Sequence, residues 1–286
     1  MLNKKKIVFI IPWFGPFPKW MNFFLKSCEL NPDVNFLFYT DTELPSKLPA
    51  NVMIKQSSFE NYKQKVSNKL QINFNPDSAY KLCDLKPALG DVHEADITEY
   101  DFWGFCDIDL IFGNIKKFLT ESILEKYDIF TTYDRRVAGH FTVLKNNKEW
   151  REKYQKCSNW QKILEDKNHH AFDEKNFSDL FIKNKNWPRL LRKAINYFRL
   201  PDSRRLYAKD TFNTPFSKYP SRKGNFDFPI DWRWENGKLT DNEGFEYLYF
   251  HFLIWKQSNW KDENTSFSVK DVSSPWRITS RGFVGG

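Results

Sequence analysis

Two aspartates separated by a single residue follow a strongly apolar segment near the middle of the chain. Asp107 and Asp109 come directly after residues 102–106 (FWGFC), which predict a buried strand. Such a strand brings both carboxylates to one edge of a sheet, while Ile108 between them points into the core. Two carboxylates at this spacing can bind one hard divalent cation, Mg²⁺ or Mn²⁺. The sequence therefore predicts a metal site at Asp107 and Asp109.

A site of this kind suits a diphosphate substrate. The bound cation keeps open positions for phosphate oxygens, and it neutralises the negative charge that grows on a departing nucleoside diphosphate. We therefore expect transfer of a group away from a diphosphate. The competing interpretation is a pair of solvated carboxylates at a strand end, because Asp-x-Asp alone is a common pattern.

The N-terminal part of the chain predicts the elements that position these aspartates. Residues 6–11 and 35–40 are β-branched and aromatic runs, as in strands buried on both faces, and residues 18–30 between them predict a helix. Parallel strands bind ligands at their carboxyl ends, so the residues that follow the two strands should face the site. These residues are Pro12, Trp13, Phe14 and Asp41.

Further apolar runs complete an α/β pattern. Residues 51–54, 128–132 and 140–144 predict strands and residues 59–69 a helix, whereas the chain beyond Trp150 is polar and largely helical in pattern. We predict a mostly parallel sheet flanked by helices, with a helix-rich C-terminal extension. Residues 1–150 would form the nucleotide-binding half, and residues 151–286 the acceptor side of the same domain.

Composition limits the partners. The formal net charge of +8 favours anionic partners, among which nucleotide diphosphates, anionic lipid head groups and nucleic acid all qualify. Four widely spaced cysteines suggest neither a zinc site nor a disulfide framework. The basic start of the chain imitates a signal peptide, but Pro12 interrupts the apolar run. We therefore expect a cytoplasmic protein without a spanning helix.

Four segments of the chain carry a resemblance to a known class of enzyme. They are IPWFGPFPKW, YKLCDLKPALG, YDFWGFCDIDLIFGN and GHFTVLKN. Together they resemble the GT-A glycosyltransferases and, more closely, an uncharacterised bacterial family thought to make polysaccharides. The resemblance covers residues 6–255. It implies a Rossmann-like GT-A fold, a nucleotide-sugar donor such as a UDP-sugar, and Mn²⁺ or Mg²⁺ as cofactor. It also implies an acceptor hydroxyl on a capsule, lipopolysaccharide or lipid-linked glycan.

The resemblance also implies roles for the donor-side residues. The turn at Pro12, Trp13 and Phe14 and the strand end at Asp41 correspond to positions that hold the base and ribose. A helix that reaches the donor sugar or its phosphates would carry Lys81, Asp84 and Lys86. A solvated helix face is the competing interpretation, and Lys86 is further restricted because it precedes Pro87.

The C-terminal segment YFHFLIWK is similar to a late motif of retaining GT-A enzymes. By this similarity, His251 would complete the shell of a metal that also binds Asp107 and Asp109, and Lys256 would meet the diphosphate. Neutral imidazole is a good ligand for Mn²⁺. The Gly and Pro that usually accompany that lysine are absent here, and a core histidine is the competing interpretation.

The acceptor side has several candidates. If the enzyme inverts, a carboxylate must take the proton of the acceptor hydroxyl, and Asp173 or Glu174 is the candidate. A retaining enzyme needs no such base. His140 is a further candidate near the acceptor, and Trp232 or Trp234 would stack on its sugar. The competing interpretation of the carboxylates is that they cap or solvate a helix.

Residues 189–199 predict a basic amphipathic helix. Leu190, Leu191, Ala194, Ile195 and Phe198 share one face, with Arg and Lys residues around it. Such helices bind anionic membrane surfaces, which would bring the enzyme to a lipid-linked acceptor. Packing of this helix on the domain is the alternative.

Two other functions compete with glycosyl transfer. A nucleotidyltransferase also uses paired aspartates, but it usually opens with a Gly-rich phosphate loop, which Pro12-Trp13-Phe14-Gly15 is not. A non-enzymatic basic module could bind glycan or nucleic acid. It predicts that alanine at Asp107 and Asp109 leaves binding intact. We favour the transferase, and expect no nucleic-acid partner.

Overall fold

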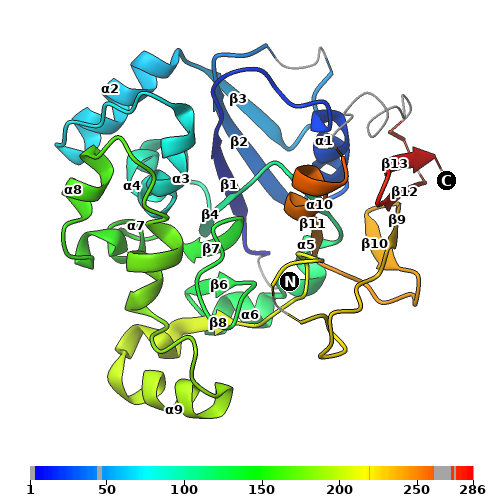
Figure 1. The fold of residues 1–286 in the computed structure, drawn as a ribbon. Coiled ribbons are helices and arrows are strands. Elements are labelled where there is room, and N and C mark those ends of the chain that lie inside the picture. Colours follow the sequence, from blue (N-terminus) through cyan, green and yellow to red (C-terminus); the bar gives the residue numbers. More distant parts are fainter. Residues whose placement is uncertain (1–3, 44–46, 219, 261–271, 274, 286) are drawn as a thin grey trace.

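A seven-stranded sheet forms the centre of the molecule (Figure 1). The computed structural model describes residues 4–43, 47–218, 220–260, 272–273 and 275–285. Across the sheet the strands are β3 (Val52–Gln56), β2 (Val34–Thr40), β1 (Ile7–Pro12), β4 (Phe102–Cys106), β7 (Phe141–Lys145), β6 (Ile129–Thr131) and β8 (Leu206–Ala208). Strand β7 runs antiparallel to both of its neighbours, and the other pairs are parallel. The predicted α/β fold with a mostly parallel sheet is confirmed.

Helices cover both faces of this sheet. The α-helices are α1 (Met21–Glu29), α2 (Phe59–Leu70), α3 (Leu82–Leu85), α4 (Leu89–Val92), α5 (Ile115–Phe118), α6 (Glu121–Lys126), α7 (Lys148–Arg151), α8 (Trp160–Glu165), α9 (Arg189–Arg199) and α10 (Leu253–Ser258). Short 3₁₀ segments are η1 (Ala79–Lys81), η2 (Lys86–Ala88), η3 (Glu94–Asp96), η4 (Lys153–Lys156), η6 (Ser178–Leu180) and η7 (Pro201–Arg205), and η5 (Asp173–Phe177) is a short π-helix. In Figure 1, α2, α3, α4, α7 and α8 lie on one side of β1 and α1 on the other.

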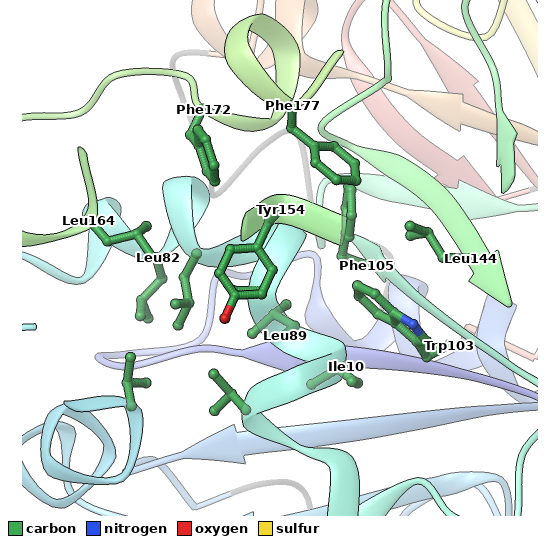
Figure 2. Packing of buried hydrophobic residues seen from close by; sticks show 14 of the residues in the cluster. Ile10, Leu82, Leu89, Trp103, Phe105, Leu144, Tyr154, Leu164, Phe172 and Phe177 are labelled. Carbon is green, nitrogen blue, oxygen red and sulfur yellow. The ribbon is translucent and has the colours of Figure 1, made fainter. Parts of the chain in front are cut away.

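The strand sequences explain why both faces are covered. In β1, Val8 and Ile10 pack into one apolar cluster, whereas Ile7, Phe9 and Ile11 pack into a second cluster on the opposite face. Figure 2 shows the first cluster, in which Ile10 meets apolar side chains of the helices and loops above it. A strand buried on both faces must be apolar at every position, as this run is.

Residues 79–92 form a broken helix rather than the continuous one that the spacing suggests. Segments η1, α3, η2 and α4 succeed one another, and Pro87 lies at the break. Proline has no N–H to donate, and its ring disfavours a regular helix before it. The break turns Lys86 toward the end of β4, as described below.

Gly90 in α4 allows this broken helix to pack closely on the sheet. A Cβ at position 90 would lie 2.3 Å from Cε2 of the buried Trp103 ring. We expect Gly90→Ala to lower the free energy of unfolding by about 1–3 kcal/mol, because the added methyl overpacks the core. In an uncrowded helix the same change would be stabilising. Urea unfolding measures the difference, and an unchanged or higher midpoint would contradict this packing.

The C-terminal part is helix-rich only up to η7. Beyond it, β9 (Asp231–Glu235), β10 (Lys238–Asp241), β12 (Trp276–Thr279) and β13 (Gly282–Gly285) form a small antiparallel sheet in the order β10-β9-β12-β13. Residues 231–235 (DWRWE) alternate between apolar and polar, which is the pattern of a half-buried strand. The prediction of a helix-rich extension overlooked this alternation.

A third pairing joins the centre of the chain to its C-terminal part. Strand β5 (Leu110–Phe112), directly after the two aspartates, pairs antiparallel with β11 (Tyr249–His251), and His251 lies opposite Leu110. The Phe252 N–H also donates to the Asp109 carbonyl over 3.2 Å. This register places His251 beside Asp109.

Candidate metal and nucleotide-sugar site

A cavity of about 460 Å³ opens at the carboxyl ends of β1 and β4. Its lining consists of Ile10, Ile11, Pro12, Trp13, Phe14, Trp20, Ala79, Tyr80, Leu82, Cys83, Lys86, Leu89, Phe105, Cys106, Asp107, Ile108, Asp109, Leu253 and Lys256. Most of this surface is apolar or aromatic, whereas the two aspartates and two lysines are charged. An apolar pocket with a few convergent polar groups is the usual form of a small-molecule site.

Three side chains have the arrangement of a metal site, and two of them, Asp107 and Asp109, line this cavity. Asp107, Asp109 and His251 each offer a ligand atom, and these atoms all lie within 4.8 Å of one another. The backbone that carries the first two is held by two hydrogen bonds, because the Asp107 N–H donates to His140 O and the Trp20 side chain donates through Nε1 to the Ile108 carbonyl. The structure thus brings together the three residues predicted as metal ligands.

One ring nitrogen of His251, Nε2, supports the interpretation as a metal site because it lacks a hydrogen-bond partner among the described residues. His251 Nδ1 is 3.0 Å from Thr214 Oγ1, whereas the buried Nε2 forms no hydrogen bond with the part of the chain that the structure describes and is 3.6 Å from Asp109 Oδ1. Leaving a buried polar atom unpaired costs about 1–3 kcal/mol. A divalent cation between Nε2 and the two carboxylates would satisfy this atom. The carboxylates suit Mn²⁺ or Mg²⁺, and the imidazole favours Mn²⁺ of the two because Mn²⁺ is a transition metal. The residues present therefore fit such an ion.

A lysine accompanies each aspartate. Lys256 Nζ donates to Asp109 Oδ2 over 2.8 Å and lies 5.3 Å from the centre of the Trp20 ring. Lys86 Nζ donates to Asp107 Oδ1 and, over 2.9 Å, to Gly139 O. Burial alone would lower the pKa of Lys86, but the charge of Asp107 outweighs it, so that the pKa is raised and the amine stays charged. Burial likewise opposes ionisation of Asp109, yet His251 and Lys256 lower its pKa.

The turn after β1 is held by the end of β2. The Asp41 carboxylate accepts a 2.9 Å hydrogen bond from Gly15 N, and Thr42 Oγ1 donates to Gly15 O. Gly15 has φ +97°, a conformation that favours glycine. Pro12, Trp13 and Phe14 line the cavity, whereas Asp41 holds this turn and is not among the lining residues, and contact of any of them with a nucleotide stays a prediction.

Lys81 and Asp84 do not reach the cavity, and the prediction that they contact the donor is wrong. Lys81 Nζ donates to Asp84 and to the carbonyls of Ile163 and Asn168, which uses its three hydrogens. Asp84 accepts from the N–H groups of residues 170 and 172. Both side chains are buried, because a fully paired ion pair can leave water. They fix the chain just before Asp173.

Asp173 and Glu174 have different surroundings in the structure. Glu174 forms an ion pair with Arg136 at 3.3 Å. Asp173 is buried near Gly139, where burial raises its pKa to about 7, the charge of Lys86 opposes this, and Glu174 and Asp107 contribute to the rise. Of the two carboxylates, Asp173 is therefore the one coupled to the charged residues of the cavity.

This raised pKa predicts a pH dependence of stability. The native carboxyl keeps its proton up to about pH 7, whereas the carboxyl of the unfolded chain loses it near the ordinary aspartate pKa of 3.8. The stabilisation by the protonated native carboxyl is therefore present at low pH and is lost as the pH rises. Between these values, wild-type stability should fall by up to about 1.4 kcal/mol per pH unit relative to Asp173→Asn. Urea unfolding in metal-free buffer measures this. Parallel pH profiles for both proteins would contradict it, and the exposed Asp179→Asn is the control.

His140 lies behind the metal ligands and not against the cavity. It is buried, its ring stacks on that of His251 at 4.2 Å, and its Nε2 is 2.7 Å from Tyr249 Oη. Burial and the neighbouring His251 lower its pKa. The prediction that it faces the acceptor is wrong, and its contacts instead orient His251.

Trp232 and Trp234 are core residues. They are 1% and 0% exposed, and they pack between the small C-terminal sheet and its neighbours, with Trp234 stacked on Trp276 at 4.5 Å. The described part of the chain encloses both rings almost completely, although Trp232 also borders a second cavity of about 300 Å³, so stacking on a sugar stays a prediction. The alternation that places them in a strand also points both inward.

Tyr80 and Cys83 are among the residues of the cavity that sequence reasoning missed. Tyr80 is 65% exposed and its ring is 4.9 Å from that of His169, while Cys83 lines the cavity beside Lys86. Both lie in the YKLCDLKPALG segment, in which the predicted site residues were the charged ones. Thr214, which orients His251, had no signal in the sequence.

Comparisons with known proteins give a family and a set of distant structural likenesses. A model of a family of unknown function (DUF6625) matches residues 9–283. The search of curated proteins finds no match.

The solved structures with detectable similarity include three glycosyltransferases. Mouse xyloside xylosyltransferase 1 in its apo form has 10% identity and a TM-score of 0.38, covering 74% of this chain and 86% of that one. The galactosyltransferase LgtC with donor and acceptor sugar analogs has 11% identity and a TM-score of 0.33, covering 60% and 71%. GlyE of Streptococcus pneumoniae TIGR4 has 15% identity and a TM-score of 0.33, covering 62% and 42%.

Proposed function

The chain belongs to the DUF6625 family, whose function is unknown, and we propose that it is a metal-dependent glycosyltransferase of the GT-A type. One observation carries the proposal. Asp107, Asp109 and His251, from segments far apart in the chain, place ligand atoms within 4.8 Å of one another beside a cavity at the carboxyl ends of parallel strands. That is where α/β sheets bind nucleotides.

The charges around the cavity favour a nucleoside diphosphate. Lys86 pairs with Asp107 and Lys256 with Asp109, so the two ion pairs are formally neutral without a metal. A bound dication would make the site positive, which suits the anionic diphosphate of a nucleotide sugar. The aromatic wall formed by Trp13, Phe14 and Tyr80 offers rings on which a base can stack.

In this proposal, Mn²⁺ or Mg²⁺ held by Asp107, Asp109 and His251 supplies Lewis-acid stabilisation of the leaving diphosphate. Lys256 lies 2.8 Å from Asp109 on the cavity wall, so it can turn its ammonium toward a diphosphate. Lys86 holds Asp107 from the other side. Asp173 is our candidate to accept the acceptor proton if the configuration inverts at the sugar. A retaining reaction needs no such base, and Asp173 would then only help to keep Lys86 charged.

The donor and acceptor follow from the resemblance of the sequence motifs. We propose a UDP-sugar as donor, and as acceptor a hydroxyl of a bacterial surface glycan or its lipid-linked precursor. Both are tested by a panel of nucleotide sugars with Mn²⁺, Mg²⁺ or EDTA, read by thermal shift and by release of nucleoside diphosphate. A ligand at 100 times its dissociation constant stabilises by about 2.7 kcal/mol. Shifts that do not depend on metal, or pyrophosphate release from a nucleoside triphosphate with a sugar phosphate, would count against the proposal.

His251 can be tested separately from the aspartates. We expect His251→Ala to weaken nucleotide affinity in Mn²⁺ roughly tenfold, about 1.4 kcal/mol, because one of three metal ligands is lost. In EDTA the affinity of the two proteins should be similar. Calorimetry measures both conditions, and His170→Ala is a control because His170 pairs with Asp166 outside the site. An equal loss with and without metal would show a purely structural histidine.

A further inference from the structure

Helix α9 presents its apolar face to solvent. Leu190, Ala194 and Phe198 follow one another at helical spacing on one side, and Leu190 is 84% and Phe198 76% exposed. Leu191 and Tyr197 flank them and are also exposed. An ordinary surface helix turns this stripe toward the core. In Figure 1, α9 lies at the periphery of the molecule, outside β8.

The opposite face of α9 attaches to the domain through polar groups. Arg192 is buried, donates to the carbonyls of Lys185 and Asp134, and forms an ion pair with the Asp134 carboxylate. Asn196, also buried, donates to the Lys183 carbonyl and accepts from its N–H. Directed hydrogen bonds of this kind fix which side of the helix faces inward. The outward orientation of the apolar stripe is therefore determined by the fold.

The charge around this stripe has one sign. Residues 183–199 contain six Lys or Arg residues and no Asp or Glu. Asp134 pairs with Arg189 and Arg192 together, which leaves the segment with a positive balance. Lys193 lies beside the stripe on one flank, Arg199 lies at the C-terminal end of the helix, and both are exposed. An exposed apolar stripe with flanking cations fits a surface that is apolar inside and anionic outside.

We propose that α9 is a docking helix that inserts Leu190, Leu191 and Phe198 into the surface of an anionic lipid bilayer. A second copy of this chain is a poorer occupant, because a symmetric pair of α9 helices would bring the same cations together. None of the helices in the described part of the chain has the length and apolar content needed to span a bilayer. This docking does not depend on the proposed transferase activity.

Vesicle binding of the full chain tests the proposal. We expect the partition coefficient to be at least tenfold higher for vesicles that contain phosphatidylglycerol than for phosphatidylcholine alone, and to fall with added salt because exposed charges are screened. Leu190→Ser with Phe198→Ser should reduce binding to the anionic vesicles at least tenfold. Phe226→Ser is the matched control, since Phe226 is 68% exposed and lies outside α9.

A charge variant separates the electrostatic contribution to vesicle binding from the apolar one. Lys193→Glu should weaken binding to anionic vesicles several-fold and leave binding to neutral ones unchanged, whereas Lys148→Glu, at a side chain 79% exposed on α7, should change neither. Equal binding to both vesicle types, or none to either, would overturn the proposal. So would sedimentation velocity showing a dimer that the double serine variant dissociates, without vesicle binding by the wild type.

Discussion

Replacing Asp109 by asparagine is expected to abolish metal-dependent turnover of the nucleotide sugar. Asp109 is buried between His251 and Lys256 and supplies one of the two carboxylates of the proposed metal site. Asparagine has nearly the same shape but carries no charge, so the site would lose both a strong ligand and the partner of Lys256. We expect release of nucleoside diphosphate to fall about a thousandfold or more, equivalent to about 4 kcal/mol of transition-state stabilisation.

The measurement is steady-state donor turnover at saturating Mn²⁺, with cooperative thermal unfolding as evidence that the variant is folded. Asp33→Asn is the matched control, because Asp33 forms an exposed ion pair with Lys4. It should keep wild-type rates. If Asp109→Asn in Mn²⁺ stays within a few-fold of the wild type, the metal site is placed at the wrong residues.

Replacing Lys256 by methionine should slow the chemical step more than it weakens binding. Lys256 is 32% exposed on the cavity wall and contacts Asp109 from α10. In the free protein its charge stabilises Asp109, whereas during transfer the greatest negative charge develops on the leaving diphosphate. We expect kcat to fall roughly a hundredfold, and KM to change only a few-fold.

Lys256→Arg should recover part of the lost rate, since it restores the charge but not the geometry of the ammonium group. Lys148→Met, at an exposed lysine on α7, is the control. A rise in KM with unchanged kcat would mean that Lys256 binds the donor equally in the ground and transition states. That outcome would contradict a role on the leaving group while leaving the metal site untouched.

The sequence by itself determined the central sheet and the position of the two aspartates. The β1 and β4 segments are apolar at every position, and only a strand covered on both faces can bury such a run. Asp107 follows immediately, so it had to emerge at the carboxyl edge of the sheet. The amphipathic pattern of α9 was equally visible, because it depends only on spacing within a single helix.

The tertiary structure decided which charged side chains reach the cavity. Lys81, Asp84 and Lys86 share one short segment, yet the break at Pro87 turns Lys86 to Asp107, while the first two pair in the core. The sequence did not distinguish Trp232 from an exposed ring on which a sugar could stack. In the structure Trp232 is buried, because it lies on the inward face of β9. Burial depends on what the rest of the chain places over a residue, which local patterns do not encode.

Local sequence patterns likewise did not determine the assembly of the metal site or the orientation of α9. Lys256 is 147 residues from Asp109 in the chain, and the pairing of β5 with β11 brings its segment back to the aspartates. For α9, the apolar stripe would ordinarily predict inward packing, but Arg192 and Asn196 hold the polar side against the domain. Local periodicity fixes which residues share a face. Contacts between distant segments decide where that face points, because their free energy depends on partners that the local sequence does not contain.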